Sequence, residues 1–419
     1  MKSLNRTILI RLRAAKAASP FAFLLLSSTA FAGERPAQLG EKFIVHEWGT
    51  FTSYQGSNGR TQHGMYREEE ALPGFVQGRC KLTGSGGDVH GSPKCSDFMP
   101  KSGSPLGVDQ KMETPVIYFY SDAKKQASVT VDFPSGIISQ WFPEATAFSP
   151  AIDHVDRVAG GKMTWDVTVN DYGSDLALPT PMAASIWLPS RQVNANTISF
   201  KDQNEKFVFY RGLGQFTVPF YVTSNIDNKV TIQNKSDEPI ANVFLMEFDG
   251  NRGYFLPLKG VGSNHSIDIA KPSIALNGHD KLEYLAEAKS ALTQALAQSG
   301  LYDDEALAMT NTWESHYFLT PGVRVLYVWP RAWADKVLPL SIAPAPDQIV
   351  RTMVGRVEIT TAQQEQALIG DLQTAAAAAT RFDYDKKIGR LAEPILRGLL
   401  SSNLGEPVKV KIEEYLRRQ

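Results

Sequence analysis

KVTIQNKSDEPIANVFLMEFDG, residues 229–250, is the stretch that decides the fold class of this chain. Val230 and Ile232 alternate with polar residues, and Val243 and Leu245 resume the alternation after the turn-like run KSDEP. A period of two is typical of a strand with one buried and one exposed face. We therefore expect residues 229–250 to form an edge hairpin of a β-sandwich.

Runs of β-branched and aromatic residues continue on both sides of this stretch. Gly, Pro, Asn and Asp separate them at intervals of about ten residues, which favours antiparallel sheets over a parallel sheet with intervening helices. The runs that we expect to form strands are VIYFY (116–120), ASVTVDF (127–133), GIISQWFP (136–143), MTWDVTV (163–169), SIWLP (185–189), KFVFYRG (206–212), QFTVPFYV (215–222), RGYFLPL (252–258), VRVLYVWP (323–330) and VRTMVGRVEIT (350–360).

Helical patterns begin only after Gly278. Residues 280–300 keep one apolar face at helical spacing, and residues 303–318 begin with acidic side chains, which the helix dipole favours. A helical tail follows from residue 361. The sequence thus predicts a mainly β protein with added helices, of the α+β class, in which antiparallel sandwich-like sheets carry a helical insertion and a helical C-terminal tail.

The length of 419 residues by itself suggests about two or three domains. The pattern divides the chain into five successive regions. These are a signal peptide (1–32), an N-terminal strand with a disulfide-stapled irregular loop (33–110), a β-sandwich-like region (111–275), helices and strands that complete the β body (276–360) and a helical tail (361–419).

Charge separates the first 32 residues from the rest. They hold five basic residues and no acidic one, and the apolar run 18–31 leads into Ala-Phe-Ala, a pattern typical of a signal-peptidase site. The run is shorter than the ~20 residues that span a bilayer, so we expect cleavage; the alternative is an uncleaved membrane anchor. The mature chain would have 387 residues, a net charge of −6, no further transmembrane segment and a periplasmic or secreted location. We expect no nucleic-acid partner, because the whole chain carries 43 basic and 44 acidic residues.

The two cysteines, Cys80 and Cys95, lie in a stretch rich in Gly, Ser and Lys. In an oxidising compartment a disulfide would stabilise such a loop by about 3 kcal/mol in the chain-entropy model. The alternative is a pair of thiolate metal ligands, but the spacing is not CxxC and no other cysteine completes a site. We therefore predict a disulfide.

Reactive side chains gather in IVHEWGTFTS, residues 44–53. Neighbouring strand residues point to opposite faces, so His46 would share a face with Ile44, and Glu47 would share the other face with Val45. Two interpretations stay open for this pair. One is a structural hydrogen bond to backbone or to an arginine, which buried polar groups require; the other is a role for His46 as a metal ligand and for Glu47 as a catalytic carboxylate.

A second group is Glu314 and His316, just before a Pro-Gly turn. In an extended segment these two side chains would lie on one face, as a carboxylate and an imidazole that bind one divalent metal must. His46 and His316 as ligands of a metal such as zinc, with Glu47 and Glu314 as catalytic carboxylates, would form the site of a metal-assisted hydrolase.

Arginines in apolar strands form a third group. Arg211, Arg324 and Arg331 could bind an acidic ligand, because guanidinium groups are planar donors suited to carboxylates. The alternative is that these arginines, together with Arg351 and Arg356, pair with nearby glutamates. The candidate partners are Glu47, Glu113, Glu314 and Glu358.

Five segments together resemble a family of exported bacterial proteins. They are VHEWGTFTS (45–53), KMETPVIYFY (111–120), FYRGLG (209–214), TPGVRVLYVWPR (320–331) and VGRVE (354–358). The resemblance covers most of the mature chain and implies a bacterial source and an exported destination. It brings no fold, activity or residue role with it.

Two hypotheses about function follow. The first is an exported protein that binds a small molecule, peptide, glycan or partner surface without catalysis, and it is favoured because HExxH, GxSxG, P-loop and GxGxxG motifs are absent. The second is the metal-assisted hydrolase built from His46, Glu47, Glu314 and His316.

Overall fold

The computed structural model describes residues 34–36, 38–79, 107–151, 157–181, 186–378, 380, 382–402 and 404–417. Ala32–Gln419 forms one compact unit, in contrast to the two or three domains that length alone suggests. The predicted signal peptide (1–32) and both cysteines of the predicted disulfide, Cys80 and Cys95, lie outside the described residues. Within those residues, no helix combines the length and the apolar character needed to cross a membrane.

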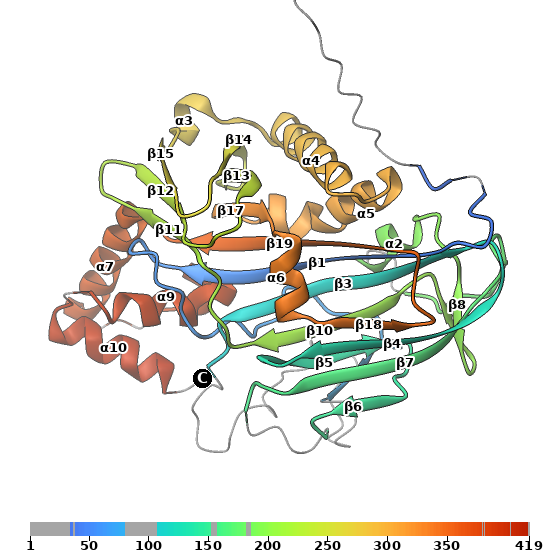
Figure 1. The fold of residues 1–419 in the computed structure, drawn as a ribbon. Helices are drawn as coiled ribbons and strands as arrows, with labels where there is room; N and C mark the ends of the chain where they lie inside the picture. Colours follow the sequence, from blue (N-terminus) through green and yellow to red (C-terminus); the bar gives the residue numbers. More distant parts are fainter. Residues whose placement is uncertain are drawn as a thin grey trace, which may run out of the picture. The chain divides into compact units, whose positions relative to one another are not determined.

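A ten-stranded mixed sheet runs through the centre of this unit (Figure 1). Its strands lie in the order β16-β14-β13-β17-β19-β1-β3-β10-β5-β2. Their bounds are β1 (Phe43–Gln55), β2 (Gln77–Gly78), β3 (Gln110–Ser121), β5 (Gly136–Phe142), β10 (Val208–Gly214), β13 (Ile240–Phe248), β14 (Arg252–Val261), β16 (His279–Asp280), β17 (Gly322–Val328) and β19 (Gln348–Ile359).

Strand β1 holds this large sheet together. All 13 of its residues are buried, and it pairs with β3 on one side and β19 on the other. The pairing with β19 is parallel, from Ile44 opposite Gln348 to Gln55 opposite Ile359. The sheets are thus mainly but not wholly antiparallel. A parallel pair needs a long crossover connection, and the long stretch of chain between β1 and β19 provides it.

Two smaller sheets complete the β structure. The first contains β18 (Leu340–Ala343), β4 (Lys125–Phe133), β7 (Gly161–Val169), β8 (Ile198–Phe200) and β9 (Gln203–Glu205), with β6 (Ala147–Ser149) paired to β7. The second contains β11 (Phe220–Ser224), β12 (Lys229–Asn234) and β15 (Ser266–Ala270).

Helices supply the remaining elements; most of them follow Gly278, as the sequence predicts, but α2 and α3 precede it. They are α2 (Trp187–Arg191), α3 (Ile274–Asn277), α4 (Lys281–Gln298), α5 (Asp303–Trp313), the π-helical turn η2 (Glu314–Phe318), α6 (Arg331–Val337), α7 (Ala362–Ala377), α8 (Tyr384–Lys387), the 3₁₀ turn η3 (Gly389–Leu391), α9 (Ala392–Leu399) and α10 (Glu406–Leu416). The predicted α+β class, mainly β with added helices, is confirmed.

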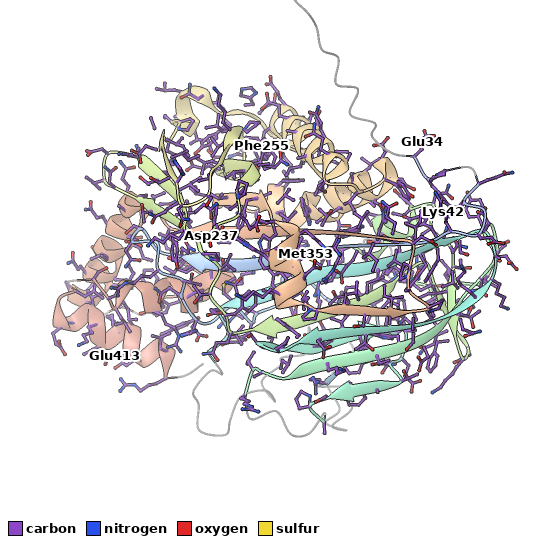
Figure 2. The ribbon with its side chains drawn as sticks, in the orientation of Figure 1. Glu34, Lys42, Asp237, Phe255, Met353 and Glu413 are labelled. Atoms are coloured by element: carbon purple, nitrogen blue, oxygen red, sulfur yellow. The ribbon has the colours of Figure 1, made fainter. Side chains whose placement is uncertain are left out.

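The large sheet is buried on both faces, and alternation along β1 assigns its side chains to them. Val45 and Phe51 join an apolar core with Val129 and Trp165 of the smaller sheets, so we call this the sandwich face. Ile44 and Trp48 join a second core formed with α4 and α5, so we call the other the helical face. Met353 of β19 is buried in the core, whereas Asp237 is exposed; both are labelled in Figure 2.

The predicted hairpin over residues 229–250 is wrong. Both halves are strands, but β12 pairs with β11 and β15, whereas β13 pairs with β14 and β17 in the large sheet. Asn234 explains the separation, because its side-chain amide donates to the carbonyls of Glu238 (2.8 Å) and Gly262 (3.1 Å) and holds the connection in a wide turn between sheets. The alternation identified two strands correctly but not their partners.

The predicted strand SIWLP, residues 185–189, is also wrong, because residues 187–191 form the short helix α2. The indole of Trp187 is buried and donates to Glu205 at 2.7 Å, and Arg191 binds the same carboxylate at 2.6 Å. Five apolar residues are too few to distinguish a strand from a helical turn.

We predict that Gly355→Ala destabilises the protein by about 1–3 kcal/mol, the usual cost of overpacking a core. A Cβ atom at Gly355 would lie 2.6 Å from the hydroxyl oxygen of Tyr327 and closer still to its ring. That ring cannot move easily, because it stacks on Phe220 with 3.8 Å between centroids. Urea denaturation measures the change in unfolding free energy.

The matched control is Gly370→Ala in α7, where a Cβ would meet no atom within 4 Å. Alanine is a better helix former than glycine, so this variant should be as stable as the wild type or more stable. Equal stability of Gly355→Ala and Gly370→Ala would contradict the close packing of β19 against Tyr327.

Candidate functional site

A row of charged side chains crosses the helical face of the large sheet. Lys111 and Glu113 come from β3, Arg211 from β10, Arg324 from β17, and Arg356 and Glu358 from β19. Side chains from outside the sheet complete the row. We call this set the charged belt: Glu68, Glu69, Glu70, Lys111, Glu113, Arg211, His316, Arg324, Arg356, Glu358 and Arg390.

Glu358 lies between two arginines. Arg324 Nε donates to both of its oxygens, at 3.0 and 3.1 Å, and Arg356 Nε donates to Oε1 at 2.6 Å. Arg324 and Glu358 lie directly opposite each other on the neighbouring strands β17 and β19, so their side chains can form this ion pair. Burial alone would raise the pKa of Glu358, but the two positive charges outweigh burial and lower that pKa to about 2.

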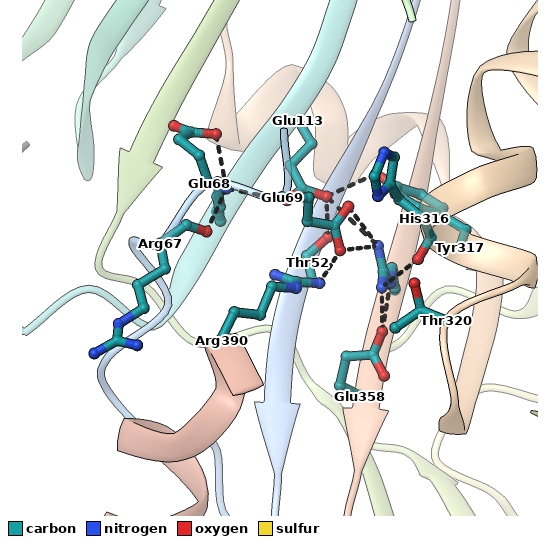
Figure 3. Close-up of polar contacts among 12 residues, drawn as sticks. Thr52, Arg67, Glu68, Glu69, Glu113, His316, Tyr317, Thr320, Glu358 and Arg390 are labelled. Atoms are coloured by element: carbon teal, nitrogen blue, oxygen red, sulfur yellow. Dashed lines mark hydrogen bonds and ion pairs between the residues drawn. The ribbon is translucent and has the colours of Figure 1, made fainter. Parts of the chain in front are cut away.

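Glu113 is the second buried carboxylate of the charged belt. Its Oε2 accepts hydrogen bonds from Thr52 at 2.8 Å and from the hydroxyl of Tyr317 at 2.7 Å, as Figure 3 shows. Lys111 Nζ lies 3.3 Å from its other oxygen. Burial opposes ionisation here too, but Lys111 and the neighbouring arginines hold the pKa of Glu113 well below its usual value.

Three consecutive glutamates of the belt contact its basic residues. Glu68 accepts from Lys111 at 2.9 Å and from Arg211 at 2.8 Å, and Glu69 lies 3.0 Å from Arg356 and also pairs with Arg390. Glu70 lies 3.2 Å from His316 Nε2, and this contact raises the pKa of His316. Figure 3 shows this irregular segment lying against strand residues and Arg390. One short segment thus binds basic groups from several separate elements.

The backbone of the segment is bound as well. Lys111 Nζ donates to the carbonyl oxygen of Arg67 at 2.7 Å, in addition to its contact with Glu68. Upstream, the hydroxyl of Tyr66 donates to Glu393 of α9 at 2.7 Å. The charged belt therefore contacts both side-chain carboxylates and main chain of this segment.

Some buried polar atoms in and beside the charged belt have no hydrogen-bond partner among the described residues. Within the described residues, the buried atoms Thr50 Oγ1, Arg211 Nε and Gln140 Oε1 make no hydrogen bond. Thr50 lies opposite Glu113 across β1 and β3, and Gln140 lies opposite Arg211 across β5 and β10. A buried polar group left without a partner costs about 1–3 kcal/mol, so these atoms are suited to contact a further polar group.

His46 and Glu47 lie on opposite faces of β1, as alternation predicts. His46 Nδ1 is 2.7 Å from Glu305 of α5 on the helical face. Glu47 accepts from Arg351 and from Tyr210, both at 2.5 Å, on the sandwich face. The prediction of a structural partner for Glu47, an arginine, is confirmed, and the two side chains share no site.

Glu314 and His316 are not in an extended segment but in the π-helical turn η2. Glu314 binds Lys289 of α4 at 2.7 Å, whereas His316 faces Glu70 in the charged belt. The four residues of the predicted hydrolase site therefore have four different partners and do not converge. The extended conformation that we expected for residues 314–316 is wrong, because these residues belong to a π-helical turn.

The arginines that we predicted as ligand-binding residues divide into two groups. Arg211 and Arg324 belong to the charged belt. Arg331 does not, because it binds Asp335 one turn further along α6, at 2.8 Å, and is partly exposed. The alternative of pairing with glutamates is confirmed for Arg351 with Glu47. The pairings with Glu113 and Glu358 are also confirmed.

Sequence reasoning missed several residues of the charged belt: Glu68, Glu69, Glu70, Lys111 and Arg390, and the neighbouring Tyr317. A run of three glutamates within a Gly- and Ser-rich segment was a usable signal. Arg390 had none, because it lies in the helical tail and approaches the sheet only through the tertiary fold.

All five segments that carry the resemblance to exported bacterial proteins meet at this place. They contribute Thr52, Lys111 with Glu113, Arg211, Arg324, and Arg356 with Glu358. No protein-family model and no curated protein matches the chain. The argument about function therefore rests on the geometry of the charged belt.

We predict that Arg356→Met destabilises the protein by about 3–5 kcal/mol, since it leaves buried carboxylates without their main partner. Arg356 is fully buried, binds Glu358 and Glu69, and stacks over the ring of Tyr317 at 4.0 Å. Chemical denaturation measures the effect.

Lys162→Met is the matched control, because the pair between Lys162 and Asp132, at 3.2 Å, is largely exposed. Its removal should leave stability nearly unchanged, since exposed pairs contribute little. A similar loss of stability in both variants would contradict a special cost of burial in the charged belt.

Acid should destabilise the protein through the carboxylates of the belt. The pKa of Glu358 falls from an ordinary value of 4.5 to about 2 on folding. Its contribution to stability is therefore complete above about pH 4.5 and is lost as pH falls towards about 2. We expect Glu358→Gln to reduce the slope of unfolding free energy against pH within that window, measured by urea denaturation. An unchanged slope would refute this role of Glu358.

Proposed function

We propose that this protein is an exported, non-catalytic binding protein whose charged belt recognises an acidic peptide segment of a partner. The observation that carries the proposal is that Glu68, Glu69 and Glu70 each contact a basic residue of the belt. Consecutive carboxylates of an irregular segment bind Lys111, Arg211 and other basic groups, which indicates the chemistry that this surface accepts.

Peptide is favoured over glycan because the belt also contacts main chain. Lys111 binds a backbone carbonyl as well as a carboxylate, and the unused hydrogen-bonding atoms include a donor, Arg211 Nε, and an acceptor, Gln140 Oε1. A peptide offers carbonyl acceptors, amide donors and side-chain carboxylates along one extended chain.

Charge balance defines how such a partner would bind. Besides His316, the belt has five basic residues and five acidic ones. The basic residues are Lys111, Arg211, Arg324, Arg356 and Arg390, and the acidic residues are Glu68, Glu69, Glu70, Glu113 and Glu358. Without the three consecutive glutamates, three positive charges would be uncompensated. A partner must therefore displace this segment, and because the segment is tethered, its effective concentration is high.

The location remains part of the proposal. A basic, then apolar stretch over residues 1–32 supports export to the periplasm or secretion. The geometry does not favour a metal-assisted hydrolase, because His46, Glu47, Glu314 and His316 each bind a different partner.

The test is a triple variant, Glu68→Gln/Glu69→Gln/Glu70→Gln, assayed against a fluorescent tetra-glutamate peptide. Binding, measured by fluorescence anisotropy, should be at least about tenfold tighter than to the wild type, because the competing segment has lost its charge. Added salt should weaken the binding, and Arg211→Gln in the triple background should reduce it.

The matched control removes three exposed acids elsewhere, as Asp227→Asn/Asp237→Asn/Glu238→Gln. It makes the same change in net charge and should leave tetra-glutamate binding at the wild-type level. If the triple variant is folded by circular dichroism but binds tetra-glutamate no better than tetra-glutamine, or no better than the control variant does, the proposal is wrong.

A further inference from the structure

A second cluster of titratable side chains lies at the start of α4, among residues that the charged belt does not use. His279 belongs to the short edge strand β16, and Glu283 and Glu287 follow at intervals of four residues. Such spacing places side chains on one helix face. The ligand atoms of these three side chains all lie within 4.8 Å of one another. Among the described residues, no other group of three or more His, Cys, Asp or Glu side chains is this close.

The distances in this cluster match those between ligands of one metal ion. His279 Nδ1 lies 3.2 Å from Glu283 Oε1 and 3.2 Å from Glu287 Oε1. Zinc binds nitrogen and oxygen at ~2.0–2.2 Å in tetrahedral geometry, which separates neighbouring ligand atoms by about 3.3–3.6 Å. Two of the three separations are therefore close to those around one zinc ion, and the ligand atoms of all three side chains lie within 4.8 Å of one another.

Hydrogen bonding does not account for the arrangement. His279 Nδ1 is inaccessible to solvent and makes no hydrogen bond, although it faces two carboxylate oxygens. An imidazole nitrogen and two carboxylate oxygens that lie this close together are ligand types suited to a divalent cation. The side chains themselves are 38%, 60% and 44% exposed, so an ion could enter from solvent.

The backbone that carries these side chains is well supported. His279 pairs with Gly253 of β14, at the edge of the large sheet. Asp280 is the N-cap of α4 and accepts from the amides of Leu282 at 2.9 Å and Glu283 at 3.1 Å. The ligands thus lie on a strand end and the first turns of a capped helix, which limits the entropy lost when they order around an ion.

We propose that His279, Glu283 and Glu287 form a binding site for a divalent transition metal ion, of which zinc fits best. An imidazole nitrogen with two carboxylates suits zinc rather than calcium or magnesium, which prefer all-oxygen ligands. Three protein ligands leave a fourth position for water or for a group of a partner. The site is separate from the charged belt and does not depend on its proposed function.

The experiment is isothermal titration of zinc chloride into the chelator-treated full chain near neutral pH. The wild type should bind one zinc ion per chain. The affinity for zinc should be at least about tenfold lower in His279→Ala and in the double variant Glu283→Gln/Glu287→Gln. Zinc should also raise the thermal midpoint of the wild type but not of these variants, because a ligand that binds only the folded state stabilises it.

His265→Ala is the matched control, since His265 is an exposed histidine in another turn. It should retain the wild-type affinity and the thermal shift. If the wild type binds zinc no more tightly than His279→Ala does, the cluster is only a histidine paired with two glutamates, and the proposed metal site is wrong. If His265→Ala loses binding as His279→Ala does, the zinc lies elsewhere and the assignment is equally wrong.

Discussion

Charge compensation on the helical face of the large sheet is the constraint on which the rest of the structure depends. Lys111, Arg211, Arg324 and Arg356 are buried there, and each lies within ion-pair distance of a carboxylate. An uncompensated charge in this position would cost several kcal/mol. Within the charged belt the strands supply Glu113 and Glu358 for this purpose, and the segment with Glu68 to Glu70 supplies the other carboxylates.

The pairing of β1 with β19 makes that arrangement possible. Residues from distant parts of the chain become neighbours, and their alternating side chains serve two different environments. Glu47 and Arg351 neutralise each other on the sandwich face, while Thr52 and Arg356 meet the charged belt on the helical face. One strand pair thus supports both the core between sheets and the proposed binding surface.

The positions of most strands and helices could be predicted from local pattern, because alternation and helical periodicity reflect burial of one face. Partners could not. β12 and β13 read as a hairpin, yet Asn234 directs the chain from one sheet to another. Residues 187–191 are too short a run to show a period, and no periodicity distinguishes the π-helical turn at residues 314–316 from an extended segment.

The sequence by itself determined the α+β class, the opposite orientation of His46 and Glu47, and the need of the buried arginines for carboxylates. These follow from the periodicity of neighbouring residues and from the cost of burying a charge. Only the tertiary structure decided which carboxylates those arginines meet, and that Arg390 from the tail reaches Glu69. Such contacts depend on strand register and on how distant segments pack, which no local pattern encodes.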